Sequence, residues 1–414
     1  MIEYEDFSLK IGTKRGEVYP ISVLDSPAGQ GRGTFRLPFD LEKIDSTLLA
    51  LGRVVRGSAP TPSRDLSPAA ATRTLPEEIG RQLFQELFAG RLGDLFHESI
   101  GRCSERQCGL RITLHTDPED PTQAELRSLP WEFLYYEEKR RFLSLYPDTP
   151  IVRYLDVPQS YTPLPLDPPL RILVVISRPR GHAGLDLDKE CKRIEREWGR
   201  HEGVQVEFME RASIEALHER LAEEQYRYHV LHYMGHGDFD EETGRGVLVM
   251  EREDDQRAAK VDGETLGVLL EPARRTMSLV FLNACETAKI TRKKGLDPFA
   301  GVAAALVLAG MPAVVAMQFP ISDDAAIQFA GTFYACLARR DPVDAAVTEG
   351  RRRILFAAGG DTKEWGTPVL FMRVPKGIIF QLGEVKPEEK PSRPIGRRKE
   401  PKPPRSVKPK GLPK

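Results

Sequence analysis

Three of the chain's eight histidines lie in one short stretch, YHVLHYMGHG, at His229, His232 and His236. The stretch is apolar and aromatic, which predicts a strand, and we expect that strand to end at Gly-His-Gly. Side chains alternate along a strand, so His232 and His236 share one face and His229 takes the other. Three roles are open to such a cluster: metal ligands, core residues, or a general base at the end of a strand.

A second apolar stretch, SLVFLNACET, reaches Cys285 where a strand meets a loop. If both strands belong to one parallel sheet, their carboxyl ends share an edge and His236 faces Cys285 across a short gap. An imidazole beside a thiol is the arrangement for nucleophilic attack on a peptide carbonyl. Gly237 lets the backbone come close, so its N–H and that of Cys285 are candidate donors to the developing oxyanion.

The alternative roles are less well supported. A zinc site needs more ligands than the two histidines that share a face, and no carboxylate stands at a suitable spacing, so we expect no metal. His229 is expected to be a core histidine. A lone free cysteine is usually buried, and only the position of Cys285 at a strand end, among small residues, favours chemistry. A nucleotide site is disfavoured because SRPRGHAG, after the strand RILVVIS, is not a phosphate-binding loop.

Composition excludes several classes of protein. Lys and Arg total 60 and Asp and Glu total 61 of the 414 residues, so the body of the chain is not expected to bind nucleic acid. The start resembles no signal peptide. The longest apolar run, FAGVAAALVLAGMPAVVAM, is broken by Gly310 and Pro312 and predicts a buried helix and strand, not a membrane span. Five sparse cysteines indicate reduced thiols and the cytoplasm.

Four segments are expected along the chain. Residues 170–382 alternate strands with helices, which predicts an α/β fold with an open, mostly parallel sheet and helices on both faces. Residues 1–156 predict a smaller α+β region that begins with a small antiparallel unit. Residues 157–169 are a Pro-rich connector. Residues 383–414 are basic and Pro-rich, which predicts a disordered tail, either simply solvated or a docking arm.

The two motifs, HYMGHG and FLNACETA, resemble those of CHAT-domain proteins, the caspase-like (clan CD) cysteine proteases often found with TPR repeats. The resemblance extends over residues 110–374, through AGMPAVVAMQFPISDDAAIQFAGTFYACL and EWGTPVLF. It implies that His236 is the general base and Cys285 the nucleophile, about 50 residues apart as in caspases. It also implies oxyanion donors at the backbone of Gly237 and Cys285, a substrate pocket lined by Asn283, and no cofactor.

The resemblance further implies a function. The chain is expected to be a cytoplasmic thiol protease that cleaves a protein substrate, stays latent until an activating protein binds, and acts in bacterial defence. It departs from the family in lacking TPR repeats, and residues 1–156 stand in their place as a pseudo-caspase half or a regulatory cap. The loop AKITRKKGLD after Cys285 is either a solvated loop or a site of self-cleavage. The competing hypothesis is a catalytically idle caspase-like scaffold that binds a partner.

Overall fold

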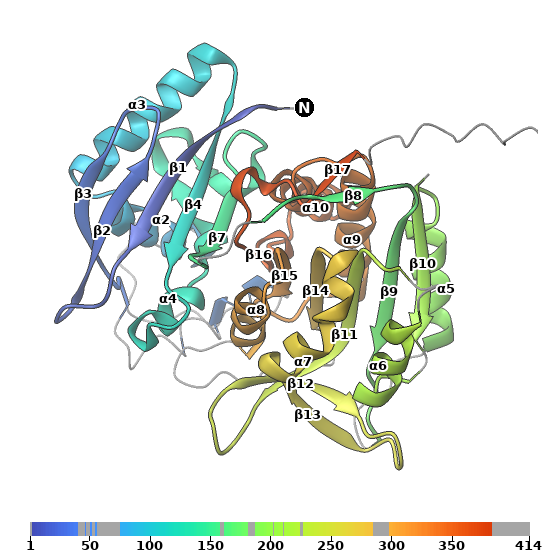
Figure 1. Ribbon diagram of the computed structural model, residues 1–414. Helices are drawn as coiled ribbons and strands as arrows, with labels where there is room; N and C mark the ends of the chain where they lie inside the picture. The colour runs from blue at the N-terminus through green and yellow to red at the C-terminus, as the bar shows by residue number, and fades with distance from the viewer. Residues whose placement is uncertain are drawn as a thin grey trace, which may run out of the picture. The chain divides into compact units, whose positions relative to one another are not determined.

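One mixed, mostly parallel sheet of 13 strands organises residues 1–383, the first of the two units into which the chain divides. Figure 1 shows the computed structural model. It describes residues 2–39, 46, 50–51, 54–55, 75–157, 161–180, 187–201, 203–209, 211–223, 227–284 and 298–382. The predicted loop after Cys285 and the predicted tail lie outside these ranges.

The C-terminal half of the sheet is the parallel unit that the sequence predicts. Its strands lie in the order β10 (Val204–Met209), β9 (Leu170–Ile176), β11 (Val230–Phe239), β14 (Leu279–Ala284), β15 (Ala313–Met317) and β16 (Pro368–Met372). Only β16 is antiparallel to its neighbour β15. A hairpin of β12 (Gly246–Glu251) and β13 (Ala258–Asp262) extends from the end of β11.

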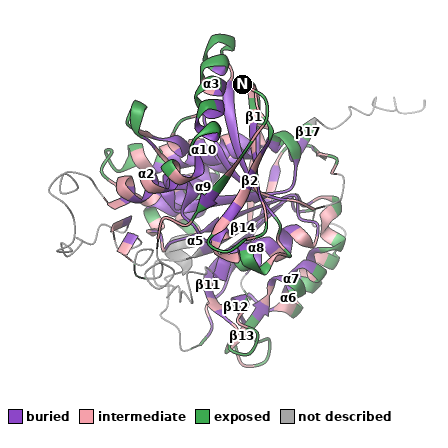
Figure 2. Cartoon of the chain, turned by 90° about the vertical axis from the view of Figure 1, so that its left-hand side faces the viewer, coloured by how far each residue is buried: buried purple, intermediate pink, exposed green. Residues whose placement is uncertain are grey.

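Helices cover both faces of this half (Figure 1). One face carries α7 (Gly263–Leu270) and α8 (Pro298–Leu308). The other carries α5 (Leu187–Trp198), α9 (Asp323–Ala338) and α10 (Val343–Ala357), and α6 (Ile214–Ala222) lies between β10 and β11 in the chain. Strands covered on both sides need apolar residues at successive positions, which explains runs such as LRILVVI. Figure 2 shows β11 and β14 buried and the outer surfaces of α6 and α7 exposed.

The N-terminal region continues the same sheet. Strands β7 (Ile151–Leu155), β4 (Gly109–Thr116) and β1 (Tyr4–Ile11) follow β16 in parallel, and β2 (Val18–Asp25) and β3 (Gly31–Arg36) complete the expected antiparallel unit. Helices α2 (Leu75–Leu87) and α3 (Arg91–Arg106) pack on it, separated at Gly90, whose φ of +55° interrupts the helical run. Further short elements include α4 (Ala124–Arg127), β5 (Tyr135–Tyr136), β6 (Arg141–Phe142), β8 (Leu164–Leu166) and β17 (Phe380–Leu382).

These observations confirm the predicted fold class, an α/β fold with a mostly parallel sheet and helices on both faces. The division at residue 156 stays a prediction, since β16 and β7 pair across it and residues 1–383 form one unit. No helix within the described ranges is long and apolar enough to cross a membrane.

A buried ionic cluster joins the two halves of the sheet. Glu132 is fully buried, and its carboxylate accepts hydrogen bonds from the Arg153 guanidinium (Nε to Oε1, 3.1 Å) and from Gln318 Nε2 (2.9 Å). Arg351, also fully buried, lies 3.9 Å from the same carboxylate. Burial lowers the pKa of Arg351 to about 10. One carboxylate therefore compensates two buried cations, one from each half.

We predict that Glu132→Ala lowers the free energy of unfolding by about 3–5 kcal/mol, because it leaves both guanidinium groups buried without a counter-ion. Urea denaturation at neutral pH measures the change. Glu98→Ala is the matched control: its ion pair with Arg102 is about half exposed, so its loss costs less than about 1 kcal/mol. Equal effects of the two substitutions would show that Glu132 does not hold the halves together.

Candidate active site

The stretch with three histidines forms β11, but the strand does not end at Gly-His-Gly as expected. Val230 to Gly235 pair in parallel with Leu279 to Ala284 of β14. From His236 to Phe239 the strand continues and pairs antiparallel with β12, with His236 opposite Val249. The prediction of a turn here is therefore wrong, because β11 changes partner instead of stopping.

Two glycines make this change of partner possible through close packing. A Cβ atom on Gly235 would lie 2.4 Å from the Tyr233 hydroxyl, and one on Gly237 would lie 2.6 Å from the Phe299 ring of α8. Neither glycine has a positive φ, so neither is needed for a turn. They are needed because a hydroxyl and a helix approach the strand too closely for a side chain.

His232 is a core residue. It is 1% exposed, its ring stacks on Phe281 with centroids 4.4 Å apart, and its Nδ1 shares a 2.6 Å hydrogen bond with the Tyr334 hydroxyl of α9. Burial lowers the pKa of His232 to about 3, so the imidazole is neutral at physiological pH.

His229 is also buried, as expected. Its Nδ1 accepts a 2.9 Å hydrogen bond from the Arg171 backbone N–H, and burial followed by the nearby Arg171 charge lowers its pKa to about 4. Within the described ranges no three His, Cys, Asp or Glu side chains are grouped to hold a metal ion.

His236 is only partly buried, unlike the other two. Tyr233 precedes His236 by three residues on β11. Its hydroxyl donates to the His236 carbonyl at 3.1 Å and to the Val249 carbonyl at 2.7 Å. Tyr233 thus fixes the backbone beside His236. We did not anticipate this role, although a tyrosine inside an otherwise apolar strand signals a hydroxyl that needs partners.

The register brings the carboxyl ends of β11 and β14 together. Gly235 lies opposite Ala284 on neighbouring strands, which run about 4.8 Å apart. The next residue on β11 is His236, and the next on the other chain segment is Cys285, which lies outside the described residues. Each of the two predicted catalytic residues therefore directly follows, in the chain, one member of the Gly235–Ala284 pair.

The hairpin leaves one side of β11 open toward β14. Strand β12 lies on the β9 side, because Ser177, directly after β9, donates from Oγ to the Val249 carbonyl at 2.7 Å. Asp240 N–H donates to the Arg245 carbonyl at 2.8 Å, and bonded pairs alternate with non-bonded ones along an antiparallel ladder. The Gly237–Leu248 pair is then a non-bonded one, and its Gly237 N–H points away from β12, toward the β14 side.

Two further residues near the edge differ in their surroundings. Asn283 pairs with Met234, is 4% exposed, and its Oδ1 has no hydrogen-bond partner among the described residues. Asp238, two residues after His236, forms a 3.0 Å ion pair with Lys260.

We predict that the stability of the wild-type protein falls as the pH is lowered from 6.5 toward 3. Between pH 6.5 and pH 3 the imidazole of residue 232 is protonated in the unfolded chain, whereas the buried ring of His232 in the folded protein stays neutral. The contribution of His232 to the free energy of unfolding is therefore present above pH 6.5 and is lost on acidification. In His232→Phe, the loss between pH 7 and pH 5 should shrink by roughly 2 kcal/mol in urea unfolding. His218→Phe, at an exposed position of α6, is the control and should retain the wild-type dependence of stability on pH. The same wild-type dependence in His232→Phe would contradict the prediction.

Comparison with known proteins identifies the family. The CHAT domain family matches residues 77–372, and no curated protein sequence matches the chain. The separase–securin complex of Saccharomyces cerevisiae is similar in structure at 13% identity and a TM-score of 0.44, over 91% of this chain and 30% of the matched chain. The Arg-specific cysteine proteinase gingipain R is similar at 11% identity and a TM-score of 0.38, over 82% and 76%. This chain thus spans less than a third of the chain matched in the separase complex. With the match to the family extending over most of its length, the chain belongs to the CHAT domain family.

Proposed function

We propose that this chain is a cysteine endopeptidase in which Cys285 is the nucleophile and His236 the general base. The observation that carries the proposal is the register of β11 and β14, which sets the residue before each of them side by side. His232 and Phe281, three register steps before Gly235 and Ala284, stack face to face. The alternation of side chains gives His236 the face of His232. In the proposal, Cys285 takes the face of Phe281, as the same alternation would give it.

The chemistry follows from this pairing. The imidazole takes the thiol proton, and the sulfur attacks the scissile carbonyl to form a C–S bond. The C–N bond then breaks, and the imidazolium returns the proton to the leaving amine. Water hydrolyses the thioester, with its proton passing through the same imidazole to the departing sulfur. No cofactor is needed for any of these steps.

The oxyanion formed during attack needs N–H donors aimed at it. Gly237 suits this role because the alternation of bonded and non-bonded pairs leaves its N–H without a partner in the β11–β12 ladder. That N–H points to the β14 side. The N–H of Cys285 is the second donor in the proposal. Tyr233, by holding the His236 carbonyl, keeps the backbone at Gly237 in the same orientation.

The substrate in this proposal is a protein, and an activating protein partner relieves latency. This part rests on the resemblance to the family, as do the role in bacterial defence and the possible self-cleavage after Cys285. A cytoplasmic setting rests on the sparse cysteines of the sequence.

We expect Cys285→Ala to abolish peptide cleavage and His236→Gln to reduce it by about 10²- to 10⁴-fold, the usual contribution of a general base. Sequencing of new protein N-termini in cells that express each form measures the loss. A thiol-directed peptidyl electrophile should label Cys285 in the wild type and far more slowly in His236→Gln. Cys191→Ala, at another cysteine of the chain, should keep full activity.

Two outcomes would contradict this assignment. Turnover that persists in a verified Cys285→Ala sample would remove the nucleophile. Absence of both labelling and new termini in the wild type, with the protein folded and its partners present in the native cell, would favour the idle scaffold.

Asn283 supports a prediction about preference. We propose that it lines the pocket for the residue before the cut, where its buried Oδ1 without a described partner accepts a hydrogen bond from the substrate. Asn283→Asp should raise kcat/KM for substrates with Arg or Lys at that position by about tenfold relative to neutral ones, since it adds a charge partner. Profiling with a peptide library measures the ratio. An unchanged ratio would place Asn283 outside the pocket.

A further inference from the structure

Two of the chain's five cysteines flank the corner at which α3 ends and β4 begins (Figure 1). Cys103 lies in the last turn of α3, and Cys108 directly precedes β4. The Cys103 side chain is 3% exposed, whereas Cys108 is only partly buried and packs against the same core. The corner therefore carries two thiols from one short stretch of chain, one closed to solvent and the other open to it.

The backbone of this corner brings the two cysteines together. Gln107, with a φ of +58°, ends the helix in the left-handed conformation. Cys108 N–H then donates to the Cys103 carbonyl at 3.0 Å, and Gln107 N–H donates to the Ser104 carbonyl at 3.3 Å. These two bonds define a Schellman motif, in which the side chains at the two ends commonly make a hydrophobic contact. In this chain, cysteines occupy both ends.

The two thiol groups interact directly. Burial, followed by a hydrogen bond and an electrostatic interaction with Cys108, raises the pKa of the Cys103 thiol well above its usual value. A disulfide needs Cα atoms that are about 4.4–6.8 Å apart. The hydrogen bond from Cys108 N–H to the Cys103 carbonyl brings the two Cα atoms into this range, because each lies only one or two covalent bonds from the bonded atoms. The folded chain therefore holds the pair where an S–S bond can form.

The difference in exposure decides the order in which the two thiols react. Oxidation by a peroxide needs an accessible sulfur, and Cys108 is the more exposed of the pair. Cys103 is buried, and its raised pKa keeps it protonated, so it reacts poorly with an oxidant in solution. Its position suits it instead for reaction with an oxidised Cys108.

We propose that Cys103 and Cys108 are a redox-sensitive pair that closes to a disulfide when hydrogen peroxide reaches the protein. The Cys108 sulfur attacks the O–O bond, which gives its sulfenic acid (S–OH) and one water. The Cys103 sulfur then attacks the Cys108 sulfur: the S–S bond forms, the S–O bond breaks, and the Cys103 thiol proton leaves in a second water. The two electrons lost by the thiols reduce the peroxide. Neither step uses His236 or Cys285, so the pair does not depend on proteolysis.

The disulfide fastens the end of α3 to a strand inside the sheet. Directly after Cys108, Gly109 N–H donates to the Glu3 carbonyl at 2.8 Å and Leu110 N–H donates to the Asp148 carbonyl at 2.7 Å, so three segments of the chain meet at this corner. The bond closes residues 103–108 into a ring, which restricts the unfolded chain more than the folded one. We therefore expect the oxidised protein to unfold at a higher urea concentration than the reduced protein.

Trypsin gives a direct readout, because Arg106 lies between the two cysteines and cleavage leaves Cys103 in CSER and Cys108 in QCGLR. The full-length wild-type protein is treated with hydrogen peroxide, the remaining thiols are blocked with N-ethylmaleimide in urea, and the digest is analysed by mass spectrometry. We expect CSER joined to QCGLR at their summed mass less two hydrogens, and dithiothreitol before blocking should restore both labelled peptides. Cys336 is the internal control: it is also 3% exposed, beside Arg339, and should stay reduced at the same dose.

Two variants separate the steps. In Cys103→Ala the sulfenic acid of Cys108 has no thiol to react with, so its labelling by dimedone should exceed that of the wild type at least tenfold. In Cys108→Ser, Cys103 should stay as reduced as Cys336. The wild-type digest decides the matter without any variant having to fold: the proposal is overturned if the linked pair does not form, whether both thiols stay reduced, Cys108 goes on to its sulfinic acid, or either joins another cysteine.

Discussion

The parallel register of β11 with β14 is the constraint on which the proposed chemistry depends. A shift of one residue would move Gly235 away from Ala284 and turn the proposed base and nucleophile to opposite faces. The register is held by burial: His232 stacks on Phe281, and its ring hydrogen-bonds to Tyr334 of α9. A one-residue shift of the register would turn His232 or Phe281 to the opposite face of the sheet and break these contacts. The core histidine thus has no part in catalysis itself but fixes the strand that carries the histidine expected to have one.

The second constraint is the continuity of the sheet from one half of the chain to the other. Gln318, which hydrogen-bonds to Glu132, directly follows β15. Leu282 pairs with Ala316, and Gln318 follows Ala316 by two residues, toward the carboxyl end of the sheet where the candidate site lies. The buried cluster of Glu132, Arg153 and Arg351 is therefore a neighbour of that edge. A change in how the N-terminal region packs would reach the candidate site through one side chain.

Local sequence patterns predicted the parts of this fold that depend on local physics. Apolar runs marked β9 and β14, and the break at Gly310 separated α8 from β15. Pairing across long distances carries no such periodic signal, so the parallel pairing of β1 with β4 and of β7 with β16 was not foreseen. At the candidate site, the face shared by His232 and His236 followed from alternation. The continuation of β11 did not, because Gly-His-Gly has the composition of a turn while its glycines serve close packing. The position of Cys285 stays a prediction.

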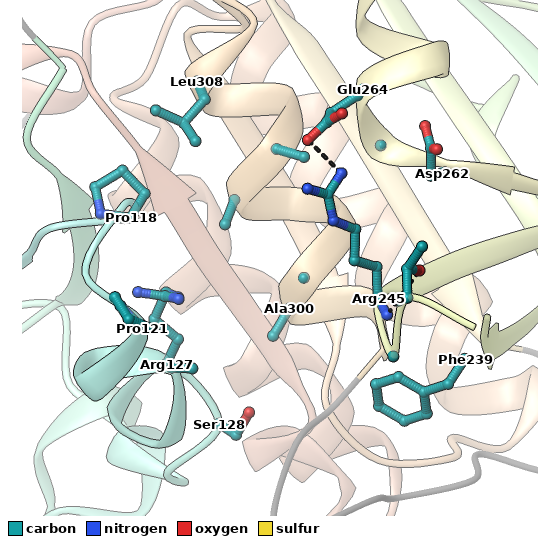
Figure 3. Close-up of a pocket in the computed structure, with 18 of the residues that line it drawn as sticks. Pro118, Pro121, Arg127, Ser128, Phe239, Arg245, Asp262, Glu264, Ala300 and Leu308 are labelled. Atoms are coloured by element: carbon teal, nitrogen blue, oxygen red, sulfur yellow. Dashed lines mark hydrogen bonds and ion pairs between the residues drawn. The ribbon is translucent and has the colours of Figure 1, made fainter. Parts of the chain in front are cut away.

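Helix α8 lies between the candidate site and a neighbouring cavity. Its Phe299 occupies the space that a side chain at Gly237 would need, and the residues that follow, Ala300 and Gly301, line a cavity of about 540 Å³ (Figure 3). Consecutive residues of one helix therefore contact the proposed oxyanion donor on one side and line this cavity on the other. Tightly packed helices move as units and do not deform smoothly. Any shift of α8 would therefore displace the Phe299 ring at Gly237, and the close contact that excludes a side chain there is what would transmit the shift.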